Sequence, residues 1–222
     1  MSLETIYKLV TNMLSASAVT LEVFFLTLLF SLPLGLLVAS LRMSKYKIIQ
    51  LPIRFYLLIM RGTPLILQLI FIYFLPSQLG DKLSVTIPML PRFGAAILAF
   101  TLNYAAYFAE IYRGGIQAVP TGQHEAAAVL GLSKVQTFFR VVLPQVIKNI
   151  LPAMGNEFMT LVKDTALAQT IGVMEIFRLA KSSTSTNSSI LPMFVAGLFY
   201  LIMNSVVSKG FSSLGKRLDY YK

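Results

Sequence analysis

The sequence contains no cysteine and a single histidine, His124, among its 222 residues. Without cysteine, the chain has no disulfide framework, no thiol catalysis and no Cys-based metal site. Charged residues are scarce as well, at 13% of the chain, against about a quarter in a soluble domain. With 56% hydrophobic residues, the chain has too little polar surface to face water on all sides. These shortages predict an integral membrane protein.

The same shortages argue against an intramembrane enzyme. A serine protease needs a general base, usually histidine, and His124 lies outside the long apolar segments. An aspartyl protease needs two membrane-embedded aspartates, but Asp81, Asp164 and Asp219 lie at or beyond the ends of these segments, far apart in sequence. A zinc site lacks its ligands. We therefore expect no catalytic residue, no metal site and no cofactor in this chain.

Five apolar segments approach the length of about 20 residues that a spanning helix needs. They lie at 17–41, 52–76, 93–112, 138–161 and 189–208. We predict an all-α integral membrane fold with five transmembrane helices. The expected divisions are an N-terminal interfacial segment at 1–16, a transmembrane domain at 17–209 and a cytoplasmic tail at 210–222. An odd number of spans places the two termini on opposite sides of the membrane.

Lysine and arginine gather on one side of these spans. The larger group is Arg42, Lys45, Lys47, Arg54, Arg113, Lys134, Arg140, Lys209, Lys216, Arg217 and Lys222. The smaller group is Lys8, Lys82, Arg92, Lys163, Arg178 and Lys181. Because cytoplasmic loops carry the excess of positive charge, the C-terminus is predicted in the cytoplasm and the N-terminus outside. This rule also explains the net charge of +10 without a nucleic-acid partner.

A short helix of small residues is predicted between the third and fourth spans, at about 120–133, on the cytoplasmic side. Thr121 is the expected N-terminal cap, and Glu125 carries a negative charge where the helix dipole favours one. The residues Ala126–Ala128 are strong helix formers with little bulk. Gly131 can adopt the left-handed conformation that ends a helix, and Ser133 can cap the next one. Such a rigid helix under the membrane suits insertion into a cleft on another protein.

These residues resemble the EAA loop of ATP-binding-cassette (ABC) importer permeases. The matching pattern is Glu125-Ala126-Ala127, then Gly131, then Val141-x-Leu143-Pro144, with valine where the family usually has isoleucine. Three further stretches look like the polar-amino-acid subgroup. They are RGTPLILQL at 61–69, YFAEIYRGGIQAVPTGQHEAA at 107–127 and NEFMTLVKDTALAQTIG at 156–172. The resemblance extends roughly from residue 20 to residue 209.

The resemblance implies a type I importer permease fold (MetI-like) in a bacterial inner membrane. It further implies a second permease copy, identical or similar, and an extracytoplasmic binding protein that delivers the amino acid. Two cytoplasmic ATPases would hold ATP and Mg²⁺ and receive the helix that carries Glu125, Ala126, Ala127 and Gly131. The permease itself would hydrolyse nothing. The alternative is a secondary transporter or channel that works alone, although a lone carrier has no need of this helix.

Polar residues recur on single faces of three predicted spans, at helical spacing. These faces carry Arg61, Pro64 and Gln68; then Asn103, Tyr107, Glu110 and Gly114; then Gln145, Asn149, Pro152, Asn156, Thr160 and Lys163. Such residues either line a pathway or pin helices together. Both readings stay open for Asn103, Gln145 and Asn149, whereas Arg61 is expected to pair with a carboxylate or a carbonyl. The candidate substrate-binding residues are Glu157, Asp164, Asn156, Asn103, Glu110, Thr160 and Gln68.

Glu157 and Asp164 lie seven residues apart, so two helical turns place both carboxylates on one side. An amino acid must carry its ammonium group through a region of low dielectric constant, where an unpaired charge is costly. Two carboxylates also suit a cationic side chain, which favours a basic amino acid such as arginine, lysine or histidine.

Two smaller expectations concern packing and loops. Gly35 and Ala39 offer a face of small residues for close helix packing. After the fourth span, residues 166–180 are apolar enough to dip into the membrane or to lie on its outer surface. The Ser/Thr/Asn run at 182–189 is expected to be a flexible connector.

Overall fold

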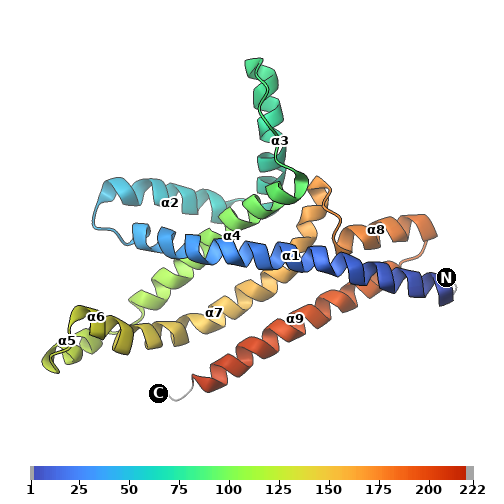
Figure 1. The fold of residues 1–222 in the computed structure, drawn as a ribbon. Coiled ribbons are helices and arrows are strands. Elements are labelled where there is room, and N and C mark those ends of the chain that lie inside the picture. The colour runs from blue at the N-terminus through green and yellow to red at the C-terminus, as the bar shows by residue number, and fades with distance from the viewer. Residues whose placement is uncertain (1–2, 219–222) are drawn as a thin grey trace.

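A computed structural model describes residues 3–218, which form helices joined by short connections (Figure 1). The helices are α1 (Leu3–Arg42), α2 (Lys47–Gly62), α3 (Leu65–Leu83), α4 (Arg92–Gln117), α5 (Thr121–Val129), α6 (Lys134–Thr137), α7 (Leu143–Asp164), α8 (Ile176–Asn187) and α9 (Leu191–Arg217). A π-helical turn, η1 (Phe138–Val142), precedes α7, and a 3₁₀ segment, η2 (Thr165–Ile171), follows it. The predicted tail beyond 218, with Asp219 and Lys222, lies outside the described residues.

Helix α4 forms the centre of the packed core. It contacts α1, α2, α3 and α7, and 61% of its most apolar stretch of 18 residues is buried. Much of the buried surface of α4 comes from alanines, because small side chains let neighbouring backbones approach closely. These alanines are Ala95, Ala96, Ala99, Ala105, Ala106 and Ala109.

The predicted small-residue face of α1 is confirmed where α1 crosses α4. A Cβ atom at Gly35 would lie 2.9 Å from the Cβ of Phe108 and 3.2 Å from the carbonyl oxygen of Ala105. Ala39, one turn further along α1, is 2% exposed. A side chain at position 35 would therefore push the two helices apart. The helix also passes through residues 16 and 17 without a break, so the predicted division there stays a prediction.

The predicted span at 52–76 is not one helix. The chain bends by 110° between α2 and α3, and Pro64 lies at this break. Because proline has no amide hydrogen and clashes with the preceding turn, the helix ends before it. In Figure 1, α3 projects away from the other helices as an arm.

Within residues 3–218, three single helices, α1, α4 and α9, are long and apolar enough to cross a membrane, and the bent pair α2–α3 brings the number to four if it forms one span. Helix α7 has 22 residues, which rise about 33 Å and match a hydrocarbon core of about 30 Å. Helix α7 carries the predicted polar face, and its sequence is therefore less apolar than the sequences of α1, α4 and α9. The predicted spans at 93–112 and 189–208 coincide with α4 and α9.

The prediction of a flexible connector at 182–189 is wrong, because α8 continues to Asn187. Its last turns are held by side chains that donate to carbonyl oxygens four residues back, from Ser185 to Lys181, Thr186 to Ser182 and Asn187 to Ser183.

At the N-terminal end of α8, the buried carboxylate of Glu175 caps the helix by accepting from the amides of Phe177 and Arg178. It also accepts a hydrogen bond from the hydroxyl of Tyr200, which ties α8 to α9.

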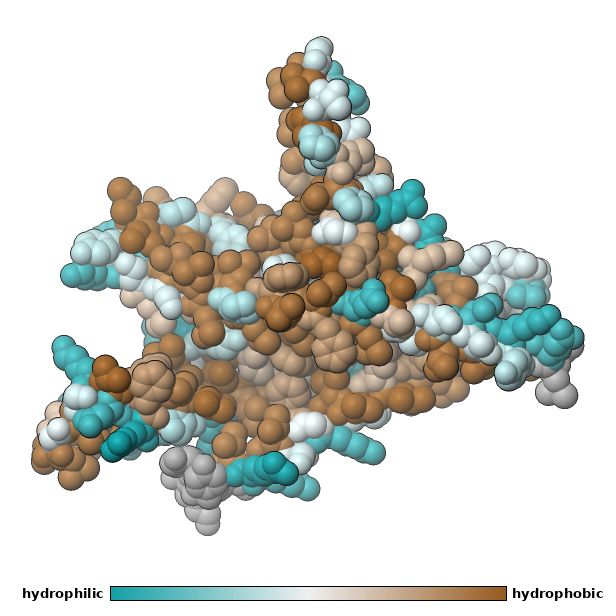
Figure 2. Space-filling model, viewed as in Figure 1, coloured by the Kyte–Doolittle hydropathy of each residue, from teal (hydrophilic) through white to brown (hydrophobic). Residues whose placement is uncertain are grey.

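The two ends of the molecule differ in what they carry. Helix α1 begins at one end, whereas the C-terminal end of α9, the start of α2 and the helices α5 and α6 all lie towards the other (Figure 1). In Figure 2, apolar residues cover most of the visible face of the bundle, and hydrophilic residues gather around α5, α6 and the N-terminal part of α1. This distribution fits a molecule whose middle is surrounded by lipid.

Candidate functional site

A cavity of about 350 Å³ opens where α4 and α7 meet the break between α2 and α3. A volume of this size is in the range of small-molecule sites. The cavity is lined by Thr63, Pro64, Leu65, Asn103, Tyr104, Tyr107, Glu157, Thr160, Asp164 and Leu167. Four of the predicted substrate-binding residues are therefore brought together on its wall.

The acidic part of the wall comes from α7. Glu157 and Asp164 lie two turns apart on this helix, about 10 Å along its axis, and both are half-buried. The hydroxyl of Tyr104 on α4 donates to Oδ2 of Asp164 over 2.8 Å, which fixes that carboxylate against the aromatic wall. Glu157 forms no ion pair within residues 3–218. Carboxylates within membrane helices are rare and face the interior of the bundle or a water-filled cavity.

The opposite wall is the helix break itself, and it needs polar partners because Pro64 leaves carbonyl groups of α2 without their helical donors. The side-chain amide of Gln68 donates to the carbonyl oxygens of Met60 (3.0 Å) and Thr63 (3.2 Å) and to the hydroxyl of Thr63 (2.9 Å). The amide of Asn103 donates to the same Met60 carbonyl (2.9 Å) and to Oε1 of Gln68 (3.0 Å). Gln68 thus lies behind the wall, and Asn103 both lines the cavity and pins α4 to the break.

Besides Gln68, two of the predicted site residues, Glu110 and Asn156, do not line this cavity. Glu110 lies further along α4, where it forms ion pairs with Arg113 (2.6 Å), Arg42 (3.8 Å) and Arg61 (4.0 Å). The expectation that Arg61 pairs with a carboxylate is therefore confirmed. Asn156 is exposed on α7 and points away from the cavity wall.

Sequence reasoning missed Thr63, Leu65, Tyr104 and Leu167 as parts of the wall. Tyr104 adjoins Asn103, and it is three residues before Tyr107, so its position on the same side of α4 was available from helical spacing. Thr63 and Leu167 lie in a helix break and in a 3₁₀ segment, where α-helical spacing does not apply. Their place on the wall depends on how the chain bends there.

The small-residue segment forms a separate feature at the end of the molecule. Helix α5 begins after Pro120 rather than at Thr121 as a cap, since Thr121 is its first helical residue. Gly131 adopts the expected left-handed conformation with φ of 72°, and Ser133 forms a capping box with Gln136. Glu125 and Ala126 are exposed, whereas Ala127 is buried. The side chains of Val129 and Leu130 beside them are 87% and 78% exposed, which leaves an apolar tip for a partner to cover.

Comparison with known proteins identifies relatives that match most of this chain. The sequence profile of the family described as binding-protein-dependent transport system inner membrane component matches residues 31–219. The octopine transport system permease protein OccM of Rhizobium radiobacter is 42% identical over 200 residues, which cover 89% of this chain and 81% of that protein.

Two further relatives transport other amino acids according to their names. The arginine transport system permease protein ArtQ of Bacillus subtilis is 36% identical over 192 residues, covering 86% of this chain and 84% of that protein. The L-cystine transport system permease protein TcyB of the same organism is 37% identical over 204 residues, covering 91% and 84%. A crystal structure of an amino acid ABC transporter with histidines is similar with a TM-score of 0.86 at 35% identity, over 98% of this chain and 99% of that chain.

Proposed function

The chain belongs to the family of binding-protein-dependent transport system inner membrane components and is a non-catalytic permease subunit of an amino acid ABC importer, and we propose that its cargo is a cationic amino acid. We further propose that this cargo binds in the cavity between α4, α7 and the α2–α3 break. The observation that carries the proposal is the pair of carboxylates, Glu157 and Asp164, on the wall of that cavity.

Electrostatics favour a cation over a neutral substrate. Moving an ionised group out of water costs several kcal/mol unless a partner of opposite charge replaces the lost hydration. A free amino acid brings one ammonium group, which one carboxylate can offset. The second carboxylate then suits a cationic side chain, and the aromatic ring of Tyr104 on the same wall adds favourable contacts to a guanidinium or ammonium group. The relative named as an arginine permease supports the same choice.

Permeases of this family work with ATPase and substrate-binding proteins. In our proposal, two ATPases bind ATP and Mg²⁺ in the cytoplasm and grip α5 through Glu125, Ala126, Ala127 and Gly131. The exposed apolar tip at Val129 and Leu130 supports this contact. The excess of lysine and arginine at the same end supports a cytoplasmic C-terminus and an N-terminus outside.

A second permease copy, identical or similar, completes the pathway in this proposal. The polar face of α7 supports it, because Asn149, Asn156 and Lys163 are exposed on a single chain. Polar side chains facing hydrocarbon are expensive. A neighbouring subunit, with a water-filled path between the two, removes that cost.

The test is uptake into proteoliposomes that contain the complete importer with its binding protein. We expect ATP-driven accumulation of arginine or lysine, and we expect Glu157→Gln and Asp164→Asn each to lower it at least about tenfold, the effect of about 1.4 kcal/mol. The matched control is Asp81→Asn, because Asp81 is an exposed carboxylate of α3 that does not line the cavity.

Two measurements distinguish loss of the substrate site from loss of assembly with the ATPase. Co-purification of the ATPase and its basal ATP hydrolysis should be unchanged in all three variants. Full uptake by both cavity variants would remove the site assignment. Uptake that needs no ATPase would instead favour a carrier that works alone.

A further inference from the structure

A second cavity lies between α1, α2 and α4, at the end of the molecule that we place in the cytoplasm. It has a volume of about 540 Å³ and is lined by Arg42, Arg54, Leu57, Leu58, Arg61, Gly62 and Glu110. We call it the arginine pocket. It shares no lining residue with the acidic cavity, and three of its seven lining residues are arginines.

The arginine pocket holds more positive charge than its own acid can neutralise. Glu110 is the shared partner of Arg42, Arg61 and Arg113, so one carboxylate faces three guanidinium groups. Arg54 forms no ion pair in the described part of the chain and donates to the amide oxygen of Gln50 over 3.0 Å. The side chains of the lining residues Arg42 and Arg61 are 24% and 45% exposed. Partly desolvated guanidinium groups in excess of carboxylates favour an added anion.

The chemistry of the pocket selects among anions. A guanidinium group presents a planar fork of donors that matches phosphate oxygens in a bidentate way. Arg42, Arg54 and Arg61 reach the pocket from two different helices, so together they can surround a tetrahedral phosphate. Basic pockets between transmembrane helices on the cytoplasmic side bind phospholipid head groups in other proteins.

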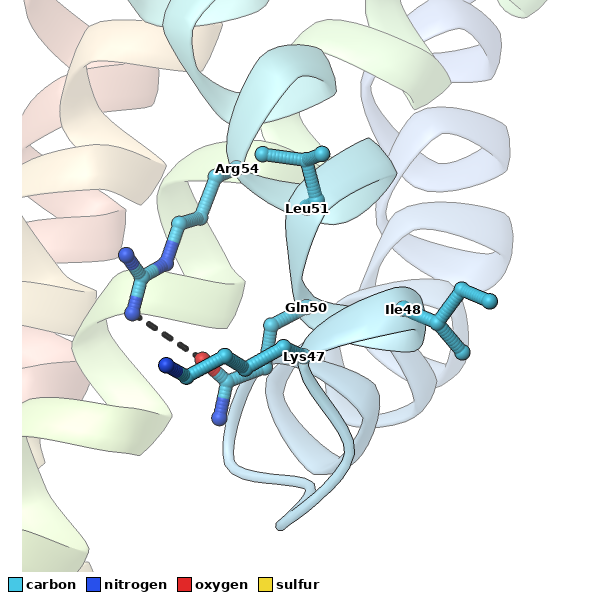
Figure 3. A pocket seen from close by; sticks show the side chains of 5 residues that line it. All are labelled: Lys47, Ile48, Gln50, Leu51 and Arg54. Atoms are coloured by element: carbon cyan, nitrogen blue, oxygen red, sulfur yellow. Dashed lines mark hydrogen bonds between the residues drawn. The ribbon is translucent and has the colours of Figure 1, made fainter.

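An apolar surface beside the pocket indicates what the phosphate is attached to. A smaller adjoining cavity of about 370 Å³ shares Arg54 and is lined by Lys47, Ile48, Gln50 and Leu51. Figure 3 shows Lys47, Gln50 and Arg54 extending towards one side, whereas Ile48 points to the other. The apolar ridge of α2 consists of Ile48, Leu51, Phe55 and Leu58, which are 86%, 70%, 63% and 68% exposed.

The juxtaposition of a basic pocket and an exposed apolar ridge is typical of a helix at the edge of a bilayer. We propose that the arginine pocket binds the phosphate of an anionic phospholipid from the cytoplasmic leaflet, with its acyl chains along the apolar ridge of α2. The inference rests on the proposed orientation and extends the proposed function. Arg61 lies in the last turn of α2, two residues before Thr63, which lines the acidic cavity, so the bound head group also steadies the wall of the transport site.

The test uses the complete importer, purified in mild detergent and examined by native mass spectrometry. The wild type is expected to retain phosphatidylglycerol and to discriminate against phosphatidylcholine. We expect Arg54→Gln to weaken retention about fivefold and the double variant Arg42→Gln/Arg54→Gln about 25-fold, at about fivefold per arginine. Arg217→Gln is the matched control, because Arg217 is an exposed arginine in the last turn of α9, outside the pocket.

A second arm replaces the lipid with inorganic phosphate at millimolar concentration. Phosphate binding that is lost in the double variant, without any retained lipid, would show a phosphate site and overturn the lipid as its source. Equal lipid retention by the double variant and by Arg217→Gln would overturn the pocket altogether.

A third arm separates this inference from the proposed function. Arginine-stimulated ATP hydrolysis is measured in nanodiscs of phosphatidylcholine with and without phosphatidylglycerol. Stimulation that rises with phosphatidylglycerol in the wild type, but not in the double variant, supports the steadying role. Absence of stimulation in both lipids contradicts the proposed cargo and leaves the mass-spectrometric result to decide the pocket.

Discussion

At the scale of single residues, Asn103 shows how one side chain serves two structures. Its amide is occupied by the carbonyl oxygen of Met60 and by Oε1 of Gln68, yet the residue also lines the acidic cavity. Its donors are therefore committed to the helix break before any substrate arrives. Of the two readings that its sequence position allowed, pinning of helices is the one that the hydrogen bonds support.

We expect Asn103→Leu to destabilise the protein by about 1–3 kcal/mol, because a nearly isosteric apolar side chain leaves Oε1 of Gln68 buried without that donor. Thr101→Val on the same helix is the matched control. The Thr101 hydroxyl is buried and has no hydrogen-bond partner within residues 3–218, so its loss should be nearly neutral. Thermal unfolding of the detergent-purified importer, followed by size-exclusion chromatography, compares the two. Equal loss of stability in both variants would contradict the role of Asn103.

At the scale of secondary-structure elements, the sequence predicted helices where local signals were strong. The spans at 93–112 and 189–208 coincide with α4 and α9, and Gly131 and Ser133 end and begin helices as expected. Pro64 lies within the second predicted span, where proline removes a backbone hydrogen bond of the helix. It did not reveal a bend of 110°, because that angle depends on the contacts that Gln68 and Asn103 make after folding.

At 182–189, sequence reasoning predicted a flexible connector where the structure has most of these residues in a helix. Serine, threonine and asparagine favour turns when judged by composition, but their side chains also bond to carbonyl groups of their own helix. In α8 they do so, and Glu175 caps its start from a position buried against Tyr200. For the acidic cavity, helical spacing paired Glu157 with Asp164, and both line the wall. The same spacing placed Thr160 on one face with Asn156 and Lys163, but of these three only Thr160 lines the cavity.

The left-handed conformation of Gly131, at the C-terminal end of α5, leads to a prediction about this helix. A Cβ atom at Gly131 would meet no atom of residues 3–218 within 4 Å, so within this chain a substitution there changes only the cost of the left-handed backbone. That cost is about 1–2 kcal/mol for most residues and smaller for asparagine. We expect Gly131→Val to lower ATP-driven uptake several-fold by misplacing the tip of α5, and Gly131→Asn to keep most of it.

Uptake is measured together with the amount of ATPase that co-purifies with each variant. Loss of uptake with reduced ATPase binding in Gly131→Val alone would support the mechanical role of this helix end. Identical behaviour of the valine and asparagine variants would show that the left-handed conformation does not matter for coupling.

At the scale of the whole molecule, the single chain leaves an apolar surface on α3 and a polar surface on α7 exposed. The arm α3 projects from the bundle with Leu67 and Phe71 56% and 60% exposed (Figure 1), whereas α7 exposes Asn149 and Asn156. The apolar surface can face lipid or another subunit. The polar surface cannot face lipid without a large cost, so it decides how the chain is placed. The polar face of α7 must lie towards water or protein, whereas the exposed apolar side chains of α9 can face lipid.

The absence of cysteine in this chain makes that placement directly measurable. In an importer whose other subunits have no reactive thiols, we expect Asn156→Cys to react with a membrane-impermeant thiol reagent at least about tenfold faster than Leu201→Cys, because the thiolate is the form that attacks the reagent and hydrocarbon disfavours that charged form. Leu201 is the matched position, 62% exposed on α9. Substrate and ATP should change the rate at Asn156→Cys if this face lines the pathway, and leave Leu201→Cys unchanged. Equal, slow modification at both positions would mean that α7 turns its polar face into a dry contact between subunits, and the water-filled path would have to run along the acidic cavity alone.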